Sequence, residues 1–179
     1  QMYHLFWDSE HGGFYFNGED SERLISNDKD IHDGATPSGN SVATNVMARL
    51  SSLTGEPQYS DIVEDQYRVF YPALSRIPQG STYYLISLML TEYPSKEIVV
   101  ISRDGDPDWD RLKHFKSSHY LPNTTWLKTD DDGELAEVAP FVESYNSIND
   151  QTTVYICEHF TCQQPTTIVD EVIEQLSTQ

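Results

Sequence analysis

The second half of the chain alternates short β-branched runs with amphipathic segments at a regular interval. The runs begin near residues 97, 124 and 152, so that 27 or 28 residues separate each from the next. This interval accommodates a strand, a covering helix and the return to the next parallel strand. The first run reads Glu-Ile-Val-Val-Ile, which is typical of a strand buried on both faces. The pattern predicts a small three-stranded parallel α/β domain.

Helices are expected after each of these strands. Their inward faces carry apolar residues at helical spacing, namely Trp109, Leu112 and Phe115; Leu135, Val138, Phe141, Val142 and Tyr145; and Ile168, Val172 and Leu176. Pro165 lies at the start of the last of them, where proline is well tolerated. The acidic segments 104–106 and 130–133 read as turns at the strand ends.

Residues 1–94 predict a mainly helical region instead. Ser38 can cap a helix that ends at Gly55. Pro57 opens a second helix, which Pro72 is expected to limit because proline lacks the backbone N–H. A third helix, over 82–92, is apolar nearly all round, which is typical of a helix buried on several sides.

The change of pattern divides the sequence into domains 1–94 and 95–179. Within the first, Gly12-Gly13-Phe14-Tyr15-Phe16 reads as a short strand paired with 23–25 in a β-hairpin. The chain opens on an aromatic segment, 3–7, of a kind that is normally buried. We therefore expect the sequence to be a piece of a longer protein.

The net charge of the chain limits the classes of partner that it can bind. A formal net charge of -18, from 29 acidic and 11 basic residues, argues against nucleic acid and against anionic membrane surfaces. No apolar run approaches the roughly 20 residues that span a bilayer. Two cysteines are too few for a secreted disulfide scaffold, so the cytoplasm is the expected location, and no cofactor is indicated.

The loop from Asp33 to Ser41 gathers two glycines, a proline and several polar side chains. Asp33, Ser38 and Asn40 either satisfy turn amides and cap the following helix, or hydrogen-bond a polyhydroxylated ligand at a cavity mouth. Nearby aromatic residues, among them Trp7 and Tyr15, either fill a core or offer flat faces on which sugar rings stack. The ligand-binding hypothesis therefore rests on these five residues.

Histidines in the same region are candidates for acid–base chemistry. His32 is adjacent to Asp33, and a histidine beside a carboxylate can act as a general base. Asp33 and His32 are accordingly the candidate catalytic residues, although no spacing fixes them as a pair.

The segment from Cys157 to Cys162 ends the third strand, at the sheet edge where parallel sheets carry ligand sites. Three interpretations stay open. The two thiols pack the turn, or they form a local disulfide or redox pair. Alternatively, Cys157, His159 and Cys162 bind zinc, but a fourth ligand is missing.

Several of these segments together resemble the C-terminal part of the large thioredoxin-domain proteins that include spermatogenesis-associated protein 20. The matching pieces are 12–16, the loop 33–41, Leu53-Thr54-Gly55, and Tyr155-Ile156-Cys157 through Thr161-Cys162-Gln163-Gln164-Pro165. The loop and the cysteine segment are the specific ones. The pieces run nearly from end to end of the chain.

The resemblance implies a parent with an N-terminal thioredoxin-like domain followed by a helical toroid. That toroid is similar to six-hairpin glycosidases and N-acylglucosamine 2-epimerases. Residues 1–94 would be the end of such an (α/α)6 barrel, with Asp33 and Asn40 at its cavity, and 95–179 an α/β appendage. The partners would be the remainder of the parent chain and a small carbohydrate.

The leading hypothesis is thus a fragment of a carbohydrate-binding or carbohydrate-modifying toroid. Sugar isomerases, epimerases and glycosidases of this kind need two acid–base groups from different helices. The present chain offers Asp33 and one histidine, so we expect no turnover from it alone. The alternatives are a protein–protein interaction module or a redox accessory domain built on the two cysteines.

Overall fold

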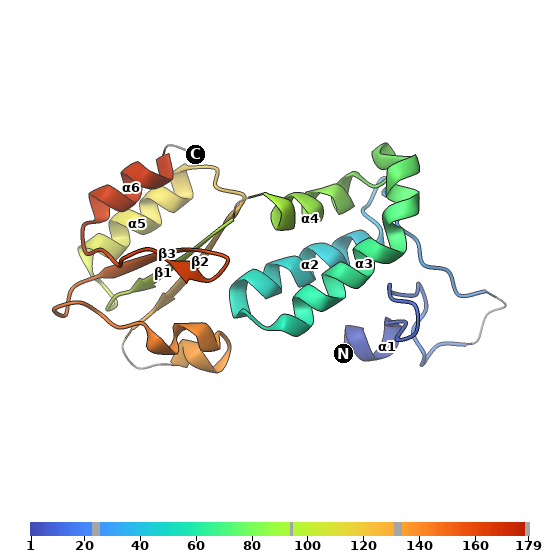
Figure 1. Cartoon of the computed structure of the whole chain (residues 1–179), viewed down its shortest axis with the longest axis horizontal. Coiled ribbons are helices and arrows are strands. Elements are labelled where there is room, and N and C mark those ends of the chain that lie inside the picture. The colour runs from blue at the N-terminus through green and yellow to red at the C-terminus, as the bar shows by residue number, and fades with distance from the viewer. Residues whose placement is uncertain (23–25, 94, 131–133, 178–179) are drawn as a thin grey trace. The chain divides into compact units, whose positions relative to one another are not determined.

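A computed structural model describes residues 1–22, 26–93, 95–130 and 134–177 of the chain. Its backbone divides into two compact units (Figure 1). The helical unit comprises Gln1–Ser51 and Glu56–Glu92, and the α/β unit comprises Ser52–Gly55 and Tyr93–Gln179. The predicted boundary at Pro94 and part of the predicted turn 130–133 lie outside the described residues.

The helical unit is built mainly from three helices and two short ones. They are α1 (Met2–Phe6), α2 (Gly39–Thr54), α3 (Pro57–Arg76), the 3₁₀ helix η1 (Pro78–Gly80) and α4 (Thr82–Glu92). Ser38 caps α2 as predicted, since its Oγ accepts the amide hydrogen of Ser41 at 3.1 Å. Gly55, with φ of +71°, follows the last residue of that helix.

The limit predicted at Pro72 is wrong, because α3 continues to Arg76 with Pro72 inside it. Proline removes one hydrogen bond from the helix. The apolar face nevertheless extends past it, since both Phe70 and Leu74 are buried. Burial of that face holds the last turn in place.

The expectation that α4 is buried on several sides is also wrong for this structure. Only Tyr84 and Ser87 of α4 are buried. Ile86 and Met89 are about half exposed, at 45% and 51%. The first aromatic segment is only partly buried, since α1 has no buried residue but Phe6 and Trp7 pack against the core of this unit.

The predicted strand 12–16 is reduced to a single bridge between Trp7 and Phe14. Its predicted partner, 23–25, lies outside the described residues. Gly13 has φ of +84°, and a Cβ placed there would lie 3.1 Å from the Phe70 ring. The chain therefore turns sharply against α3 at this glycine, which a longer strand would not permit.

A four-stranded mixed sheet forms the centre of the α/β unit. Its strands are β1 (Lys96–Ile101), β2 (Thr124–Thr129), β3 (Thr153–Glu158) and β4 (Thr161–Cys162). Their order is β2-β1-β3-β4. The helices are α5 (Pro107–Ser118), the 3₁₀ helices η2 (Glu134–Glu137) and η3 (Pro140–Ser144), and α6 (Val169–Ser177).

The predicted all-parallel sheet is wrong at its third strand. β1 and β2 are parallel, but β3 pairs with β1 in the antiparallel direction. Pro140 supplies the physical reason, because it interrupts the helix expected over 135–145 and leaves the two short helices η2 and η3. Both Thr129 and Thr153 pair with Ile101, so the connection returns at the same end of the sheet.

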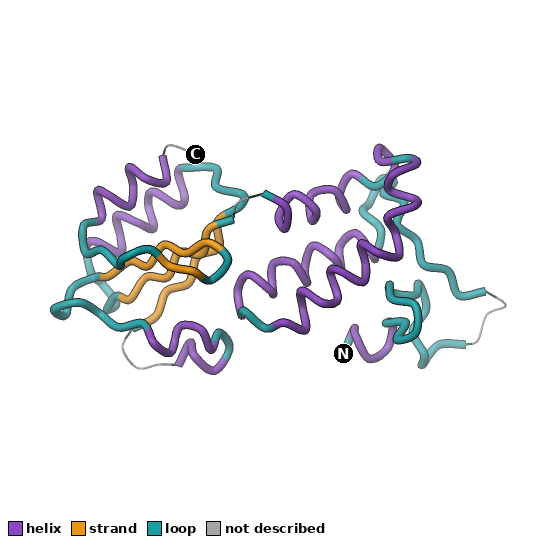
Figure 2. The backbone as a smooth tube through the Cα atoms, viewed as in Figure 1, coloured by secondary structure: helices purple, strands orange, loops and turns teal. Residues whose placement is uncertain are grey.

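Two apolar layers cover the sheet, as the helices on either side of the strands in Figure 2 show. Ile98 and Val100 face α5 and α6, whereas Val99 and Ile101 face η2 and η3. This alternation is that of a strand buried on both faces, as the sequence predicts for 97–101. Among the described residues, no helix is both long and apolar enough to cross a bilayer.

Candidate functional site

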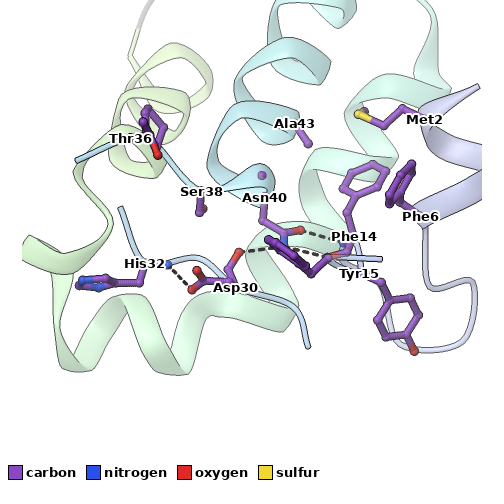
Figure 3. Close-up of a pocket in the computed structure, with 13 residues that line it drawn as sticks. Met2, Phe6, Phe14, Tyr15, Asp30, His32, Thr36, Ser38, Asn40 and Ala43 are labelled. Atoms are coloured by element: carbon purple, nitrogen blue, oxygen red, sulfur yellow. Dashed lines mark hydrogen bonds between the residues drawn. The ribbon is translucent and has the colours of Figure 1, made fainter. Parts of the chain in front are cut away.

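A cavity of about 430 Å³ opens in the helical unit beside the start of α2 (Figure 3). Its apolar wall consists of Met2, Phe6, Phe14, Tyr15, Phe16, Pro37 and Ala43. Its polar wall consists of Asp30, His32, Thr36, Ser38 and Asn40, together with Gly39. The cavity thus combines aromatic faces with a few polar groups, which is typical of small-molecule sites.

Asn40 holds the two sides of this cavity together. Its Oδ1 accepts the amide hydrogen of Phe14 at 2.8 Å, and its Nδ2 donates to the Phe14 carbonyl at 2.8 Å and to the Asp30 carbonyl at 2.9 Å. Both amide hydrogens are therefore used by backbone carbonyls. Asn40 lies at the cavity, as proposed for a ligand-binding residue, but its amide group serves to fix the wall.

Asp33 is not among the residues that line the cavity. Its Oδ1 accepts the amide hydrogen of Ser38 at 2.9 Å, and its Oδ2 accepts that of Tyr83, near the start of α4, at 2.7 Å. Burial acts to raise the pKa of Asp33, but hydrogen bonds from Ser38, Ser41 and the α4 amides outweigh it and lower that pKa. A catalytic or ligand-binding role for Asp33 stays a prediction.

The other candidate residues divide between cavity and core. His32 lines the cavity, but its ring points away from Phe6 and Phe14 in Figure 3. Ser38 lines it with a hydroxyl that is 2.9 Å from that of Ser41. Trp7 does not line it and packs edge-on against Phe14, with ring centroids 4.9 Å apart.

Asp30 is the acidic group that the cavity presents. One oxygen of its carboxylate accepts the amide hydrogen of His32 at 2.8 Å. Its second oxygen has no hydrogen-bond partner among the residues that the structure describes. Asp30 was not among the candidate residues named from the sequence.

A buried ion pair behind the cavity was also missed. Oδ2 of Asp8 lies 2.6 Å from Nζ of Lys29 and 2.7 Å from the hydroxyl of Tyr15. Oδ1 accepts the amide hydrogens of Glu10 and His11. The Asp8 side chain is only 7% exposed. Twenty-one residues separate Asp8 from Lys29, so no sequence periodicity marks the pair.

These contacts set the protonation of both groups. The ammonium of Lys29 and the Tyr15 hydroxyl lower the pKa of Asp8 far below its ordinary value, against the opposing effect of burial. The same Asp8 carboxylate raises the pKa of Tyr15. The ring of Tyr15, a predicted ligand-binding residue, thus lines the cavity, and its hydroxyl donates a hydrogen bond to Asp8.

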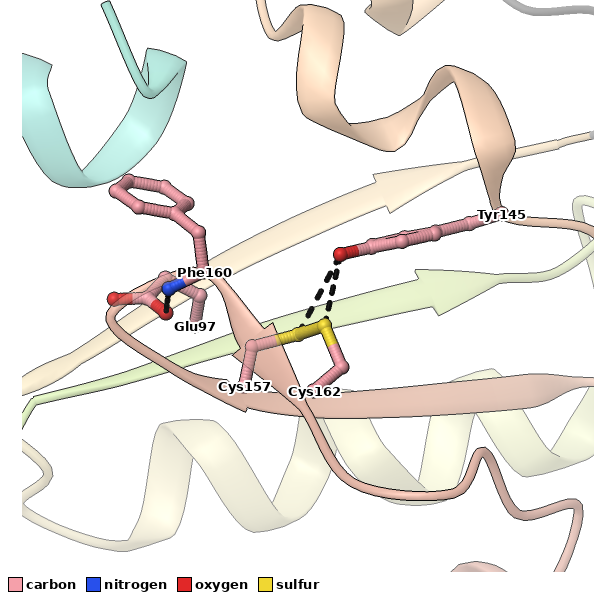
Figure 4. Close-up of a disulfide and its surroundings, with 5 residues drawn as sticks. All are labelled: Glu97, Tyr145, Cys157, Phe160 and Cys162. Atoms are coloured by element: carbon pink, nitrogen blue, oxygen red, sulfur yellow. Dashed lines mark hydrogen bonds between the residues drawn. A yellow bond between two sulfur atoms is a disulfide. The ribbon is translucent and has the colours of Figure 1, made fainter. Parts of the chain in front are cut away.

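The α/β unit carries a second distinctive feature, a disulfide between Cys157 and Cys162 (Figure 4). The two cysteines are opposite each other on β3 and β4. His159 and Phe160 form the turn between them, both with positive φ. The disulfide is the second of the three interpretations of this segment.

Binding of zinc by Cys157, His159 and Cys162 would require both cysteines as thiolates, which the disulfide does not provide. Within the described part of the chain, no group of three or more His, Cys, Asp or Glu side chains is arranged to hold a metal ion.

Comparison with known proteins relates the chain to a longer protein. It is 31% identical over 166 residues to human spermatogenesis-associated protein 20, and 33% identical over 170 residues to the rat protein of that name. Each match covers 91% of this chain. The chain is a distant homologue of a portion of spermatogenesis-associated protein 20. The resemblance seen in the sequence is confirmed to that extent.

The chain spans about a fifth of the length of spermatogenesis-associated protein 20, since the matches cover 21% of the human and rat proteins. An uncharacterised protein of Caenorhabditis elegans is 22% identical over 174 residues, which is 94% of this chain and 23% of that protein. No family model matches the chain, and no solved structure matches it.

Proposed function

We propose that the helical unit contributes one wall of a carbohydrate-binding or carbohydrate-modifying cavity in a longer protein. The cavity between α1, the loop before α2 and the start of α2 carries this proposal. Four aromatic residues line it beside the acidic side chain of Asp30. The ligand would be a small carbohydrate.

The chemistry of the cavity suits such a ligand. A sugar ring has an apolar C–H face that packs on aromatic rings and a rim of hydroxyls that seek acceptors. Phe16 is 77% exposed at the cavity, which leaves its ring accessible for stacking. The second oxygen of Asp30 can accept a hydroxyl hydrogen there.

The surface of α4 supports a place for this unit in a helical toroid. Ile86 and Met89 expose large apolar side chains at 45% and 51%. Surface of this kind favours packing against further helices. We propose that the remainder of a longer protein, a toroid together with a thioredoxin-like domain, supplies the helices that pack against this surface. The cytoplasmic location expected from the sequence stays a prediction.

Turnover would need a second acid–base group. Asp30 is the carboxylate available at the cavity, because both oxygens of Asp33 accept backbone amide hydrogens. The ring of His32 points away from the aromatic wall (Figure 3). An epimerase-like or glycosidase-like reaction uses two such groups on opposite sides of the sugar. The isolated chain is therefore expected to bind and not to react.

Calorimetric titration of the 179-residue chain with a panel of monosaccharides and disaccharides tests the proposal. Binding is expected at millimolar dissociation constants. Phe16→Ala should weaken it about fivefold, the value of one aromatic contact. Tyr71→Ala is the matched control, because Tyr71 is 69% exposed and does not line the cavity. The absence of any saturable binding, or equal weakening by both variants, would contradict the proposal.

A further inference from the structure

The β3–β4 hairpin presents its two sulfur atoms unequally. Cys157, on β3, has no exposed surface, whereas Cys162, on the short strand β4, is only partly buried. A sulfur nucleophile arriving from solvent therefore reaches the Sγ of Cys162. Thiol–disulfide exchange depends on which sulfur is attacked and on what stabilises the one that leaves.

Tyr145, just after η3, directs its hydroxyl at the sulfur–sulfur bond (Figure 4). The hydroxyl oxygen is 2.8 Å from Sγ of Cys162 and 3.8 Å from Sγ of Cys157. A disulfide sulfur carries no hydrogen, so the hydroxyl is the donor. The ring of Tyr145 is stacked on Tyr155 with centroids 4.3 Å apart, which holds this donor in place.

Glu97 is the register partner of Cys157 on the neighbouring strand. Register partners in an antiparallel pair project from the same face of the sheet, so the two side chains are neighbours. Glu97 is 3% exposed, and one of its oxygens accepts the amide hydrogen of Phe160 at 3.1 Å. No lysine or arginine of the described residues pairs with it.

A buried carboxyl group without a cationic partner favours its protonated form. Burial accordingly raises the pKa of Glu97, against the effects of the Phe160 amide and of His159. The pKa of Tyr145 is raised mainly by burial, then by Tyr155, and to a smaller extent by the charge of Glu97. The Glu97 carboxylate thus acts electrostatically on the phenol that contacts the disulfide.

We propose that Cys157, Cys162, Glu97 and Tyr145 form a thiol–disulfide exchange site that accepts two electrons from a dithiol. The dithiol is the co-reactant, and Glu97 is the proton donor to the sulfur that leaves. This activity is separate from the proposed carbohydrate cavity, which lies in the other unit.

The exchange proceeds in two balanced steps. One thiolate of the dithiol attacks Sγ of Cys162; a new S–S bond forms, the Cys157–Cys162 bond breaks, and the Cys157 thiolate takes the proton of Glu97. The second thiolate of the dithiol then attacks the other sulfur of the dithiol, which is bonded to Cys162 in the mixed disulfide. This releases the Cys162 thiolate, which accepts the Tyr145 hydrogen bond. The dithiol is oxidised to a disulfide, and solvent returns protons to Glu97 and Cys162.

Reduction of the full chain by dithiothreitol under native conditions tests the proposal. Rapid quenching with iodoacetamide and mass spectrometry count the free thiols over time. Reduction is expected to be much faster than global unfolding, which tryptophan fluorescence after a denaturant jump measures separately. Reduction no faster than unfolding would show a purely structural disulfide and overturn the proposal.

The role of Glu97 has its own readout. Glu97→Gln is expected to slow reduction by about a factor of 10², the lower end of general acid catalysis. Glu174→Gln, an exposed glutamate on α6, is the matched control and should leave the rate unchanged. Equal rates for the two variants would overturn the proposal.

The wild-type chain provides the same test if Glu97→Gln does not fold. The rate at which dithiothreitol reduces the wild-type disulfide is divided by the concentration of dithiothreitol thiolate. This quotient is measured from neutral to acidic pH. The quotient should rise as Glu97 becomes protonated. A quotient independent of pH would contradict proton donation.

Single-cysteine variants test the direction of attack. Cys157→Ser leaves Cys162 as a thiol, which should form a mixed disulfide with oxidised glutathione in the folded state. Cys162→Ser leaves the buried Cys157, which should stay unmodified until the chain unfolds. Preferential modification of Cys157 would reverse the assignment and contradict the proposed order.

Discussion

Each of the two units buries a carboxyl group, and the pKa values of the two groups shift in opposite directions. Asp8 of the helical unit is 7% exposed and accepts hydrogen bonds from Lys29, Tyr15 and two backbone amides. Glu97 of the α/β unit is 3% exposed and accepts the amide hydrogen of Phe160. The pKa of Asp8 is lowered, chiefly by Lys29, whereas burial raises the pKa of Glu97.

Two carboxyl groups with similarly small exposed fractions therefore have pKa values that shift in opposite directions. The number and charge of the donors decide whether a buried carboxyl ionises, because burial alone always favours the neutral form. The Asp8 group is saturated and its contacts serve the fold. Glu97 has a raised pKa, and it is the register partner of a cysteine in the one bond of the chain that thiols can cleave. This contrast separates a structural carboxylate from a reactive one.

The largest effect is expected from Asp8→Ala. This change leaves the Lys29 ammonium without its partner at a site where its side chain is only 16% exposed. Removing one member of a buried pair should lower the free energy of unfolding by about 3 kcal/mol. Urea unfolding followed by circular dichroism measures it at pH 7.

The matched control for that experiment is Asp65→Ala. Asp65 pairs with Arg68 on the surface of α3, with side chains 42% and 73% exposed. Its removal should cost less than about 1 kcal/mol. Equal losses at the two positions would show that the burial of Asp8 does not matter.

Wild-type stability should also depend on Asp8 ionisation. Because its folded pKa lies below the ordinary 3.8, the stabilisation is complete above about pH 4 and is lost as the pH falls below it.

A smaller effect is expected when the disulfide is reduced. The bond joins residues five apart, and closing so short a loop constrains the unfolded chain by only about 2 kcal/mol. The turn and the strand pairing hold the hairpin without it. Urea unfolding with and without dithiothreitol measures the difference. Complete unfolding upon reduction would show that the fold depends on the disulfide and would contradict this small effect.

The smallest effect is expected from Glu97→Gln, and its sign depends on pH. A carboxyl whose folded pKa is raised destabilises the fold as the pH rises above its unfolded value of about 4.5. Glutamine removes that cost, so the variant should gain stability relative to wild type as the pH rises from 4 to 7. Urea unfolding at both values measures it. A gain that does not change with pH would contradict the assignment.

Local features of the fold are predicted well from the sequence. The strand pattern from 97, the Ser38 cap and the extent of α4 over 82–92 depend on neighbours along the chain, and the structure confirms them. The direction of β3 was predicted wrongly, because the 27- or 28-residue interval fits a crossover equally well until Pro140 is considered. Strand direction depends on the path of the connection, which periodicity does not record.

Only some residues of the candidate site were predicted, because sequence periodicity does not record contacts between distant segments. The aromatic residues and Asn40 were expected at a cavity, and Asn40, Phe14 and Tyr15 do line one. Asp33 drew attention by its glycine-rich setting, yet its partners at Tyr83 and Tyr84 are 50 and 51 residues away. Contacts over such distances, like that of Asp8 with Lys29, leave no pattern in a single sequence.

Titration of the carboxyl groups by carbon-13 NMR tests the central contrast most directly. Side-chain carboxyl resonances of Asp8 and Glu97 are assigned with Asp8→Asn and Glu97→Gln and followed as a function of pH. The Asp8 resonance should titrate below 3.8 and the Glu97 resonance above 4.5. Glu97 titrating at or below its ordinary value would contradict the raised pKa on which its proposed proton donation to the disulfide depends.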